Sequence, residues 1–176
     1  MVGIQKKYVG LLGGSFDPAH KGHLGISKIA LKKLKLKKIY WVITKKNPFK
    51  NKTFYSLNKR IKYAKKITKT QKKFEIIYLD NTINSTRIID VINYFIKKKK
   101  IKNIYFIIGS DNLIQFHKWK SWKKIVKLVK LIVFSRKGYD KKGKKSIVAK
   151  YLKNKIIFIN NKPIVISSTK LRKNIK

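Results

Sequence analysis

Cysteine is absent from this chain of 176 residues, and acidic residues are scarce. Without cysteine, the chain can form neither a disulfide framework nor a thiolate metal site. Only six residues carry a carboxylate side chain: Asp17, Glu75, Asp80, Asp90, Asp111 and Asp140. So small a number argues against a hydrolase with paired carboxylates and against an acid-rich metal cage. Chemistry that works by positioning phosphates needs few acids, so the composition favours phosphoryl-type transfer.

Long apolar stretches are also missing. No run reaches the length of a membrane-spanning helix, and the first residues lack the apolar core and the cleavage site of a signal peptide. We therefore expect a cytoplasmic protein with no membrane partner. The chain length predicts one domain over residues 1–176, which buries about two-thirds of the surface of the unfolded chain.

The most informative segment is GGSFDPAHKGH, at residues 13–23. It follows an apolar run at 8–12 that predicts a buried strand, and it precedes residues 24–34, where apolar side chains recur on one helical face. Two of the chain's three histidines lie in it. At such a strand-to-helix junction, main-chain N–H groups and the positive end of the helix can face an anion.

The residue types in this segment suit a phosphate. We expect Gly13 and Gly14 to let the backbone turn tightly and approach the phosphate closely. His20 and His23 are three residues apart, so they point roughly the same way on the first helical turn and can donate hydrogen bonds to phosphate oxygens. The alternative is an ordinary glycine turn with two surface histidines, and the full spacing weighs against it.

The segment resembles the GG-(S/T)-F-D-P-x-H-x-G-H signature of the nucleotidyltransferase superfamily. Because a histidine stands at position 20, it is most similar to the signature of bacterial nicotinate-nucleotide adenylyltransferases. The resemblance continues, in the family's order, through a P-x-K-like loop at 47–50, an (I/M)-G-(A/G/S)-D segment at 107–113, an F-x-x-W stretch at 116–119 and an I-S-S-T-x-(I/L)-R motif at 166–172. It therefore covers most of the chain.

The resemblance implies two groups of binding residues. The residues implied to bind ATP, with the two histidines as the catalytic residues, are Gly13, Gly14, Ser15, Phe16, His20, His23, Gly109, Asp111, Ser167, Ser168, Thr169 and Arg172. The residues implied to bind nicotinate mononucleotide are Asp17, Lys50, Arg87, Trp119 and Arg136.

Some of these residues also have a plain structural interpretation. Residues 109–111 can form a turn that caps the next helix instead of a site for ribose hydroxyls, and the hydroxyls at 167–169 can serve as ordinary N-caps. Trp119 and Trp122 share helical spacing with apolar neighbours, so one of them belongs to the core. By position in the motif, we assign Trp119 to the nicotinate ring and Trp122 to the core.

The implied reaction transfers the adenylyl group of ATP to nicotinate mononucleotide, giving deamido-NAD and pyrophosphate. It uses Mg²⁺ on the phosphates and no metal site built by the protein. One departure from the family concerns the acceptor, because relatives carry a Tyr-Thr pair where this chain has Arg87-Ile88. Nicotinamide mononucleotide and phosphopantetheine therefore remain alternative acceptors, and a homo-oligomer is left open.

Alternating patterns predict a Rossmann-like, doubly wound α/β fold with a mainly parallel sheet and helices on both faces. Runs rich in Ile, Val, Tyr and Phe predict strands at 7–13, 38–44, 74–79, 103–109, 131–135 and 156–159. Helical spacing predicts helices at 22–34, 56–69, 86–98, 119–129 and 142–153, with a short one near 168–175. In such a sheet, ligands bind beyond the carboxyl ends of the strands, and several of the motifs fall there.

Positive charge dominates the remaining composition. The 47 lysines and arginines give a formal net charge of +41, yet only Arg60, Arg87, Arg136 and Arg172 are arginines. Recognition of bases favours arginine, and the lysines are spread over every segment, so the pattern is typical of a solvated surface. We still expect non-specific association with RNA or DNA at low salt. A nucleic-acid-binding protein on an inactive scaffold is the alternative function.

Repulsion among so many like charges destabilises the folded chain, and dissolved ions screen it. The melting temperature should therefore rise from low to moderate salt, and also when polyphosphate is added. Differential scanning fluorimetry across a salt series measures this rise. A flat response would show that the lysines repel one another too weakly to affect folding.

Overall fold

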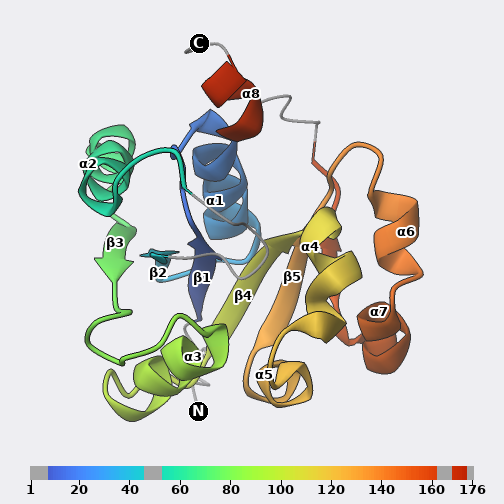
Figure 1. Cartoon of the computed structure of the whole chain (residues 1–176). Helices are drawn as coiled ribbons and strands as arrows, with labels where there is room; N and C mark the ends of the chain where they lie inside the picture. The colour runs from blue at the N-terminus through green and yellow to red at the C-terminus, as the bar shows by residue number, and fades with distance from the viewer. Residues whose placement is uncertain (1–7, 46–52, 162–167, 174–176) are drawn as a thin grey trace.

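The computed structural model describes residues 8–45, 53–161 and 168–173. Its centre is a six-stranded sheet in which every neighbouring pair is parallel, in the order β3-β2-β1-β4-β5-β6 (Figure 1). The strands are β1 (Val9–Gly14), β2 (Lys38–Ile43), β3 (Phe74–Tyr78), β4 (Ile104–Gly109), β5 (Lys130–Phe134) and β6 (Ile157–Ile159). The strand order reverses between β1 and β4, which is the switch point where ligands bind in doubly wound sheets.

Helices cover both faces of this sheet, as the sequence predicted. They are α1 (Lys21–Lys33), α2 (Leu57–Thr68), α3 (Ile88–Lys97), α4 (Ser110–Gln115), α5 (Trp122–Leu128), α6 (Asp140–Lys144), α7 (Ile147–Leu152) and α8 (Ser168–Lys173), with 3-10 turns η1 (Phe116–Lys118) and η2 (Lys153–Lys155). Of the helices that the structure describes, none combines the length and the apolar character that crossing a lipid bilayer requires.

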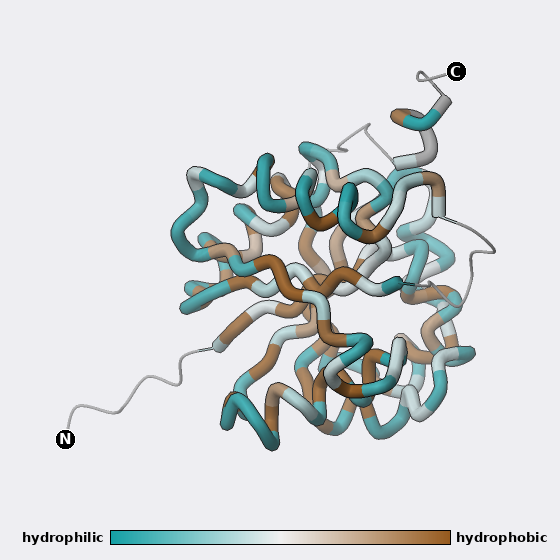
Figure 2. Tube along the Cα trace, turned by 60° about the vertical axis from the view of Figure 1, so that its left-hand side comes forward, coloured by the Kyte–Doolittle hydropathy of each residue, from teal (hydrophilic) through white to brown (hydrophobic). Residues whose placement is uncertain are grey.

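Side chains alternate along the strands and so build two separate cores. On one face, residues such as Tyr40 and Phe106 pack with apolar side chains of α3, α4, α5 and α7. On the other face, residues such as Trp41 and Ile107 pack with α1 and α2. Figure 2 shows the same arrangement, with hydrophobic strands enclosed between helices whose outer sides are hydrophilic.

All six predicted strands are present, but the helices depart from the prediction in three places by more than two residues. The helix expected over 119–129 begins only at Trp122, because Ser121 has a φ of 61° and cannot continue a right-handed helix. The helix expected over 142–153 is two helices, since Ser146 caps α7 by accepting a hydrogen bond from the Ala149 N–H at 3.2 Å. Helix α4 was not predicted, because six residues are too few to show a periodicity.

Candidate active site

The two histidines of the 13–23 segment form the start of α1. His20 is the N-cap residue, and its Nδ1 accepts a hydrogen bond from the Gly22 N–H at 3.1 Å. In return, Nδ1 of His23 accepts from the His20 N–H at 3.2 Å. This is a capping box built from two imidazoles, whose ring centroids lie 3.8 Å apart. Because both Nδ1 atoms accept, each neutral ring carries its proton on Nε2.

His20 is held in its neutral form. Burial lowers its pKa to about 4, and the positive charge of Arg136 acts in the same direction. Protonation would also place a proton on the Nδ1 atom that accepts from Gly22. Near neutral pH the ring is therefore an uncharged hydrogen-bond donor at the positive end of a 13-residue helix.

The chain turns after β1 at Phe16, Asp17 and Pro18, and the expectation that the two glycines make this turn is wrong. Gly13 and Gly14 are the last residues of β1, neither has a positive φ, and an added Cβ at either would meet only ordinary contacts. Phe16 has a φ of 46°, in the left-handed region that bulky residues rarely adopt. Its ring is buried, stacks on Trp41 at 5.0 Å and lies 4.8 Å from the ring of His23. This packing holds the turn in place.

Asp17 anchors the same loop from the inside. It is only 4% exposed, and its carboxylate accepts hydrogen bonds from the N–H groups of Phe54 at 2.7 Å and Tyr55 at 2.9 Å. This geometry ties the loop to the segment that leads into α2. Contact between Asp17 and a nicotinate nucleotide stays a prediction.

The C-terminal motif docks on this loop from the other end of the chain. Ser168 Oγ donates to the carbonyl oxygen of Pro18 at 3.0 Å. Arg172 donates to the carbonyl oxygen of Asp17, and its Nη1 lies 3.7 Å from the Asp17 carboxylate. Figure 1 shows α8 beside the end of α1 that carries the histidines. Two motifs that are about 150 residues apart therefore meet at one edge of the sheet.

The segment after β4 faces Arg136. Gly109 is the N-cap residue of α4, but no side chain caps this helix, and Ser110 and Asp111 already belong to it. A Cβ at position 109 would lie 2.4 Å from Asp111 Oδ1, so any residue other than glycine would displace this carboxylate. Asp111 Oδ2 accepts from Arg136 Nη1 at 2.6 Å, while Oδ1 is buried without a hydrogen-bond partner among the described residues. A ribose hydroxyl at Oδ2 would have to share it with Arg136.

Of the residues predicted to bind the nicotinate nucleotide, Arg87 and Trp119 lie on the face of the sheet that α3 and α5 cover. Trp119 stacks on Phe116 with ring centroids 4.8 Å apart and meets the ring of Phe106 edge-on at 6.0 Å. Both Trp119 and Trp122 are partly buried and pack against the same core. Their burial therefore does not show which of the two is available to stack on a nicotinate ring.

Arg87 stands at the exposed start of α3, 3.7 Å from Asp90. The side chain of the next residue, Ile88, lies 3.6 Å from where a Cβ on Gly13 would be. The start of α3 is therefore beside the end of β1. Lys50 and Ser167, and the side chain of Thr169, lie outside the described residues, so their predicted contacts stay predictions.

Sequence reasoning missed Arg60. This residue is buried in α2 and donates a hydrogen bond to the carbonyl oxygen of Ser15 at 2.7 Å. The sequence offered one signal for a special role of this residue: it is an arginine, whereas the other basic residues of α2 are all lysines.

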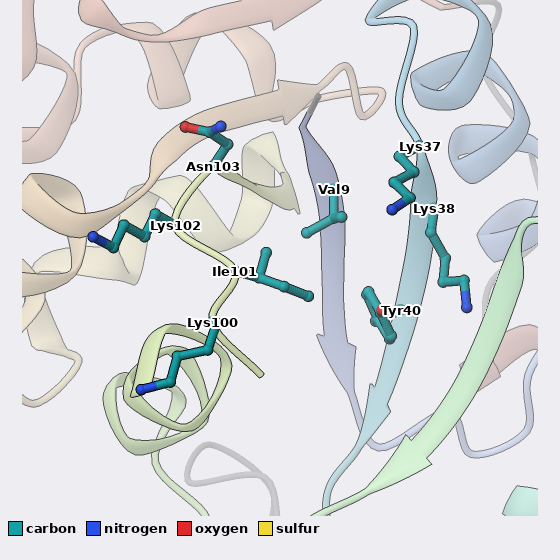
Figure 3. Close-up of a pocket in the computed structure, with 8 residues that line it drawn as sticks. All are labelled: Val9, Lys37, Lys38, Tyr40, Lys100, Ile101, Lys102 and Asn103. Atoms are coloured by element: carbon teal, nitrogen blue, oxygen red, sulfur yellow. The ribbon is translucent and has the colours of Figure 1, made fainter. Parts of the chain in front are cut away.

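A cavity of about 290 Å³ lies at the opposite edge of the sheet, where β1, β2 and β4 begin (Figure 3). Lysines contribute half of its lining, but Lys38 is paired with Glu75 at 2.8 Å. Figure 3 shows Lys100 and Lys102 pointing away from Val9. The ammonium groups do not converge, and the motifs lie at the other ends of the strands, so this cavity is not part of the candidate active site.

A helix that begins at two histidines, at the switch point of a parallel sheet, has the geometry with which nucleotide-binding α/β proteins hold phosphate groups. The chain belongs to the cytidylyltransferase-like family, whose model matches residues 11–174. It is 51% identical over 170 residues to a probable nicotinate-nucleotide adenylyltransferase of Pelagibacter ubique, covering 96% of this chain and 94% of that protein. A relative of the same name from Endomicrobium trichonymphae is 35% identical over 169 residues, covering 96% of this chain and 86% of that protein.

A solved structure confirms the fold. The Plasmodium falciparum nicotinic acid mononucleotide adenylyltransferase complexed with NaAD matches with a TM-score of 0.77 and 21% sequence identity, over 96% of this chain and 83% of that one. The resemblance drawn from the sequence motifs to nicotinate-nucleotide adenylyltransferases is thus confirmed by relatives that carry this name.

The pKa of His20 predicts how stability depends on pH. Between its ordinary value of 6.5 and about 4, the unfolded chain binds a proton at this residue more readily than the folded chain. The stability that the folded chain gains from the neutral His20 ring is complete above pH 6.5 and is lost as the pH falls toward about 4. From about pH 7 to about pH 5, the wild type should lose on the order of 1 kcal/mol more free energy of unfolding than His20→Asn.

Asparagine is the matched control because it caps a helix but does not titrate. Urea denaturation of both proteins at the two pH values measures the difference. An identical pH dependence would contradict a strongly lowered pKa at His20.

Proposed function

We propose that this protein transfers the adenylyl group of ATP to nicotinate mononucleotide, giving nicotinate adenine dinucleotide and pyrophosphate. The observation that carries the proposal is the meeting of the Asp17–Pro18 loop, the His20–His23 pair and the Ser168–Arg172 motif at one end of the sheet. The names of the relatives support the choice of substrates. A cytoplasmic location is part of the same proposal, since the reaction belongs to the biosynthesis of NAD.

The ATP phosphates lie at the start of α1. Main-chain N–H groups and the positive end of the helix attract them, and His20 donates to them through Nε2–H. Arg172 and Ser168 approach the same loop from α8 and add a positive charge and a hydroxyl. On the other side of the switch point, Gly109 and Asp111 face the ribose of ATP.

The reaction is a displacement at phosphorus. A phosphate oxygen of nicotinate mononucleotide attacks the α-phosphorus of ATP and forms a new P–O bond, while the bond to the β-phosphate oxygen breaks and pyrophosphate leaves. No covalent enzyme intermediate is needed. The chain aligns the two nucleotides, and His23 stabilises the charge that develops on the transferred phosphate.

ATP enters this reaction as its magnesium complex. Within residues 8–45, 53–161 and 168–173, no three His, Asp or Glu side chains come together in a way that could hold a metal ion. The carboxylate of Asp17, at the phosphate loop, already accepts two main-chain N–H groups. We therefore assign Mg²⁺ to the phosphate oxygens, where it offsets their negative charge.

Nicotinate mononucleotide lies on the α3 side of the switch point. Its ring packs on Trp119, and its carboxylate pairs with Arg87, whose guanidinium is exposed and only 3.7 Å from Asp90. An exposed pair of this kind is weak, so a ligand carboxylate can replace Asp90 at little cost. Lys50 and Arg136 are proposed to contact the phosphate of this nucleotide.

The acceptor is tested by pyrophosphate release with ATP and each of nicotinate mononucleotide, nicotinamide mononucleotide and phosphopantetheine. We expect turnover with nicotinate mononucleotide and much less with the amide. Arg87→Ala should raise the KM for nicotinate mononucleotide about tenfold while the KM for ATP stays the same, because one charge-assisted hydrogen bond is lost. Turnover with phosphopantetheine alone would overturn the proposal.

His23→Ala separates the enzyme from a nucleic-acid-binding protein on an inactive scaffold. The substitution should lower kcat by about 10²-fold or more, because a donor to the transition state is removed. Retention of the chain on immobilised RNA should not change, because it depends on the total lysine charge. Unchanged kcat in the variant would exclude the catalytic role assigned to His23.

A further inference from the structure

Arg60, the fourth residue of α2, is a buried positive charge surrounded by main-chain oxygens. It is only 1% exposed, so it cannot touch a substrate in this conformation. Its guanidinium donates hydrogen bonds to four carbonyl oxygens, those of Ser15 at 2.7 Å, Thr44 at 2.8 Å, Tyr55 at 3.2 Å and Lys45 at 3.3 Å. These carbonyls belong to the loop after β1, to the end of β2 and to the segment before α2.

Two buried carboxylates bind hydrogen-bond donors of these segments, whereas Arg60 binds their carbonyl oxygens. Asp17 accepts the N–H groups of residues 54 and 55, and Asp80 accepts the N–H of Lys45 at 2.6 Å and the hydroxyl of Thr44 at 2.9 Å. Burial lowers the pKa of the Arg60 guanidinium, while the negative charges of Asp17 and Asp80 act to raise it. One cation and two anions therefore supply hydrogen-bond partners for main-chain groups of three irregular segments. These groups have no partner in a neighbouring strand.

The contact with Ser15 sets the direction of the next amide. The peptide between Ser15 and Phe16 is trans, so the Ser15 carbonyl and the Phe16 N–H point in opposite directions. Because the carbonyl points to Arg60, the Phe16 N–H points away from it. Phe16 also has the unfavourable φ of 46°, so the loop needs both this hydrogen bond and the packing of the Phe16 ring to keep its shape.

We propose that Arg60 is a positioning residue for ATP. It holds the loop after β1 in the shape in which its main-chain N–H groups and the histidines at the start of α1 meet the phosphates. This inference rests on the proposed function, since it concerns the ATP site, and it assigns to α2 a part in catalysis that no motif indicates.

Lysine cannot replace this side chain. The guanidinium is planar and sends its N–H groups in several fixed directions, so one group reaches four carbonyls on three segments. An ammonium group is a compact donor with three hydrogens and a tighter hydration shell, which makes its burial here more costly. Arg60→Lys therefore keeps the charge and removes the geometry.

The first test compares Arg60→Lys and Arg60→Gln with Ile67→Ala, a control that weakens the packing of the same helix away from the loop. ATP affinity is measured by titration calorimetry, and kcat and KM by pyrophosphate release, below the lowest melting temperature of the set. Both Arg60 variants should bind ATP about tenfold more weakly or worse, with Arg60→Lys the better of the two. Ile67→Ala should lose stability and keep the ATP affinity of the wild type.

The second test uses the wild type and so does not depend on the folding of a variant. With only four arginines in the chain, selective ¹⁵N labelling gives four Nε–H signals, and the one from Arg60 is identified by replacing the other three in turn. Saturating ATP should slow hydrogen exchange at Arg60 Nε–H, which donates to Tyr55. The slowing should exceed that at the main-chain N–H of Val129, which donates to the carbonyl oxygen of Ile125 at 3.1 Å in the core on the other face of the sheet.

The two failures can be told apart. If the wild type does not bind ATP, the proposed function is wrong. If the wild type binds ATP, but folded Arg60 variants bind it equally well, or ATP slows exchange no more at Arg60 than at Val129, then Arg60 only stabilises the fold.

Discussion

Hydrogen bonds between buried charged side chains and the main chain hold the loop that carries the candidate site. The loop after β1 has no regular structure, so its buried N–H and carbonyl groups need partners outside any strand ladder. Arg60 binds the Ser15 carbonyl, and the Asp17 carboxylate binds the amides of residues 54 and 55. Each such group would cost about 1–3 kcal/mol if left unpaired. The loop, the end of β2 and the start of α2 therefore form one rigid support for the histidines.

The placement of arginine follows from the same requirement. In a chain with a formal charge of +41, Arg60 and Arg172 donate to the main chain of the motif loop, and Arg136 pairs with Asp111. The position of Arg60 needs a planar group with several donors in fixed directions. Exposed positions need only a solvated charge, which lysine provides equally well. The composition of the surface can therefore be almost entirely lysine while the site keeps its arginines.

Much of the fold was predictable because the strands are short apolar runs and the first helices have clear periodicity. The errors have local causes that apolar patterns do not encode. Ser121 adopts a left-handed conformation, Ser146 caps a new helix, and α4 has only six residues. In the site, the pairing of His20 with His23 was predictable from their spacing. The assignment of the turn to glycine failed, because the stacking of Phe16 on Trp41 makes a left-handed conformation tolerable there.

The sequence by itself determined the family, the six strands and their alternation with helices, because these depend on residue type and spacing over short stretches. Only the tertiary structure decided which distant groups meet. The contacts of Ser168 and Arg172 with the Asp17–Pro18 loop, and of Arg60 with three separate carbonyl segments, join residues far apart in the chain. Such contacts depend on how the sheet twists and how the helices dock on it. The sequence itself does not distinguish a buried arginine from an exposed one.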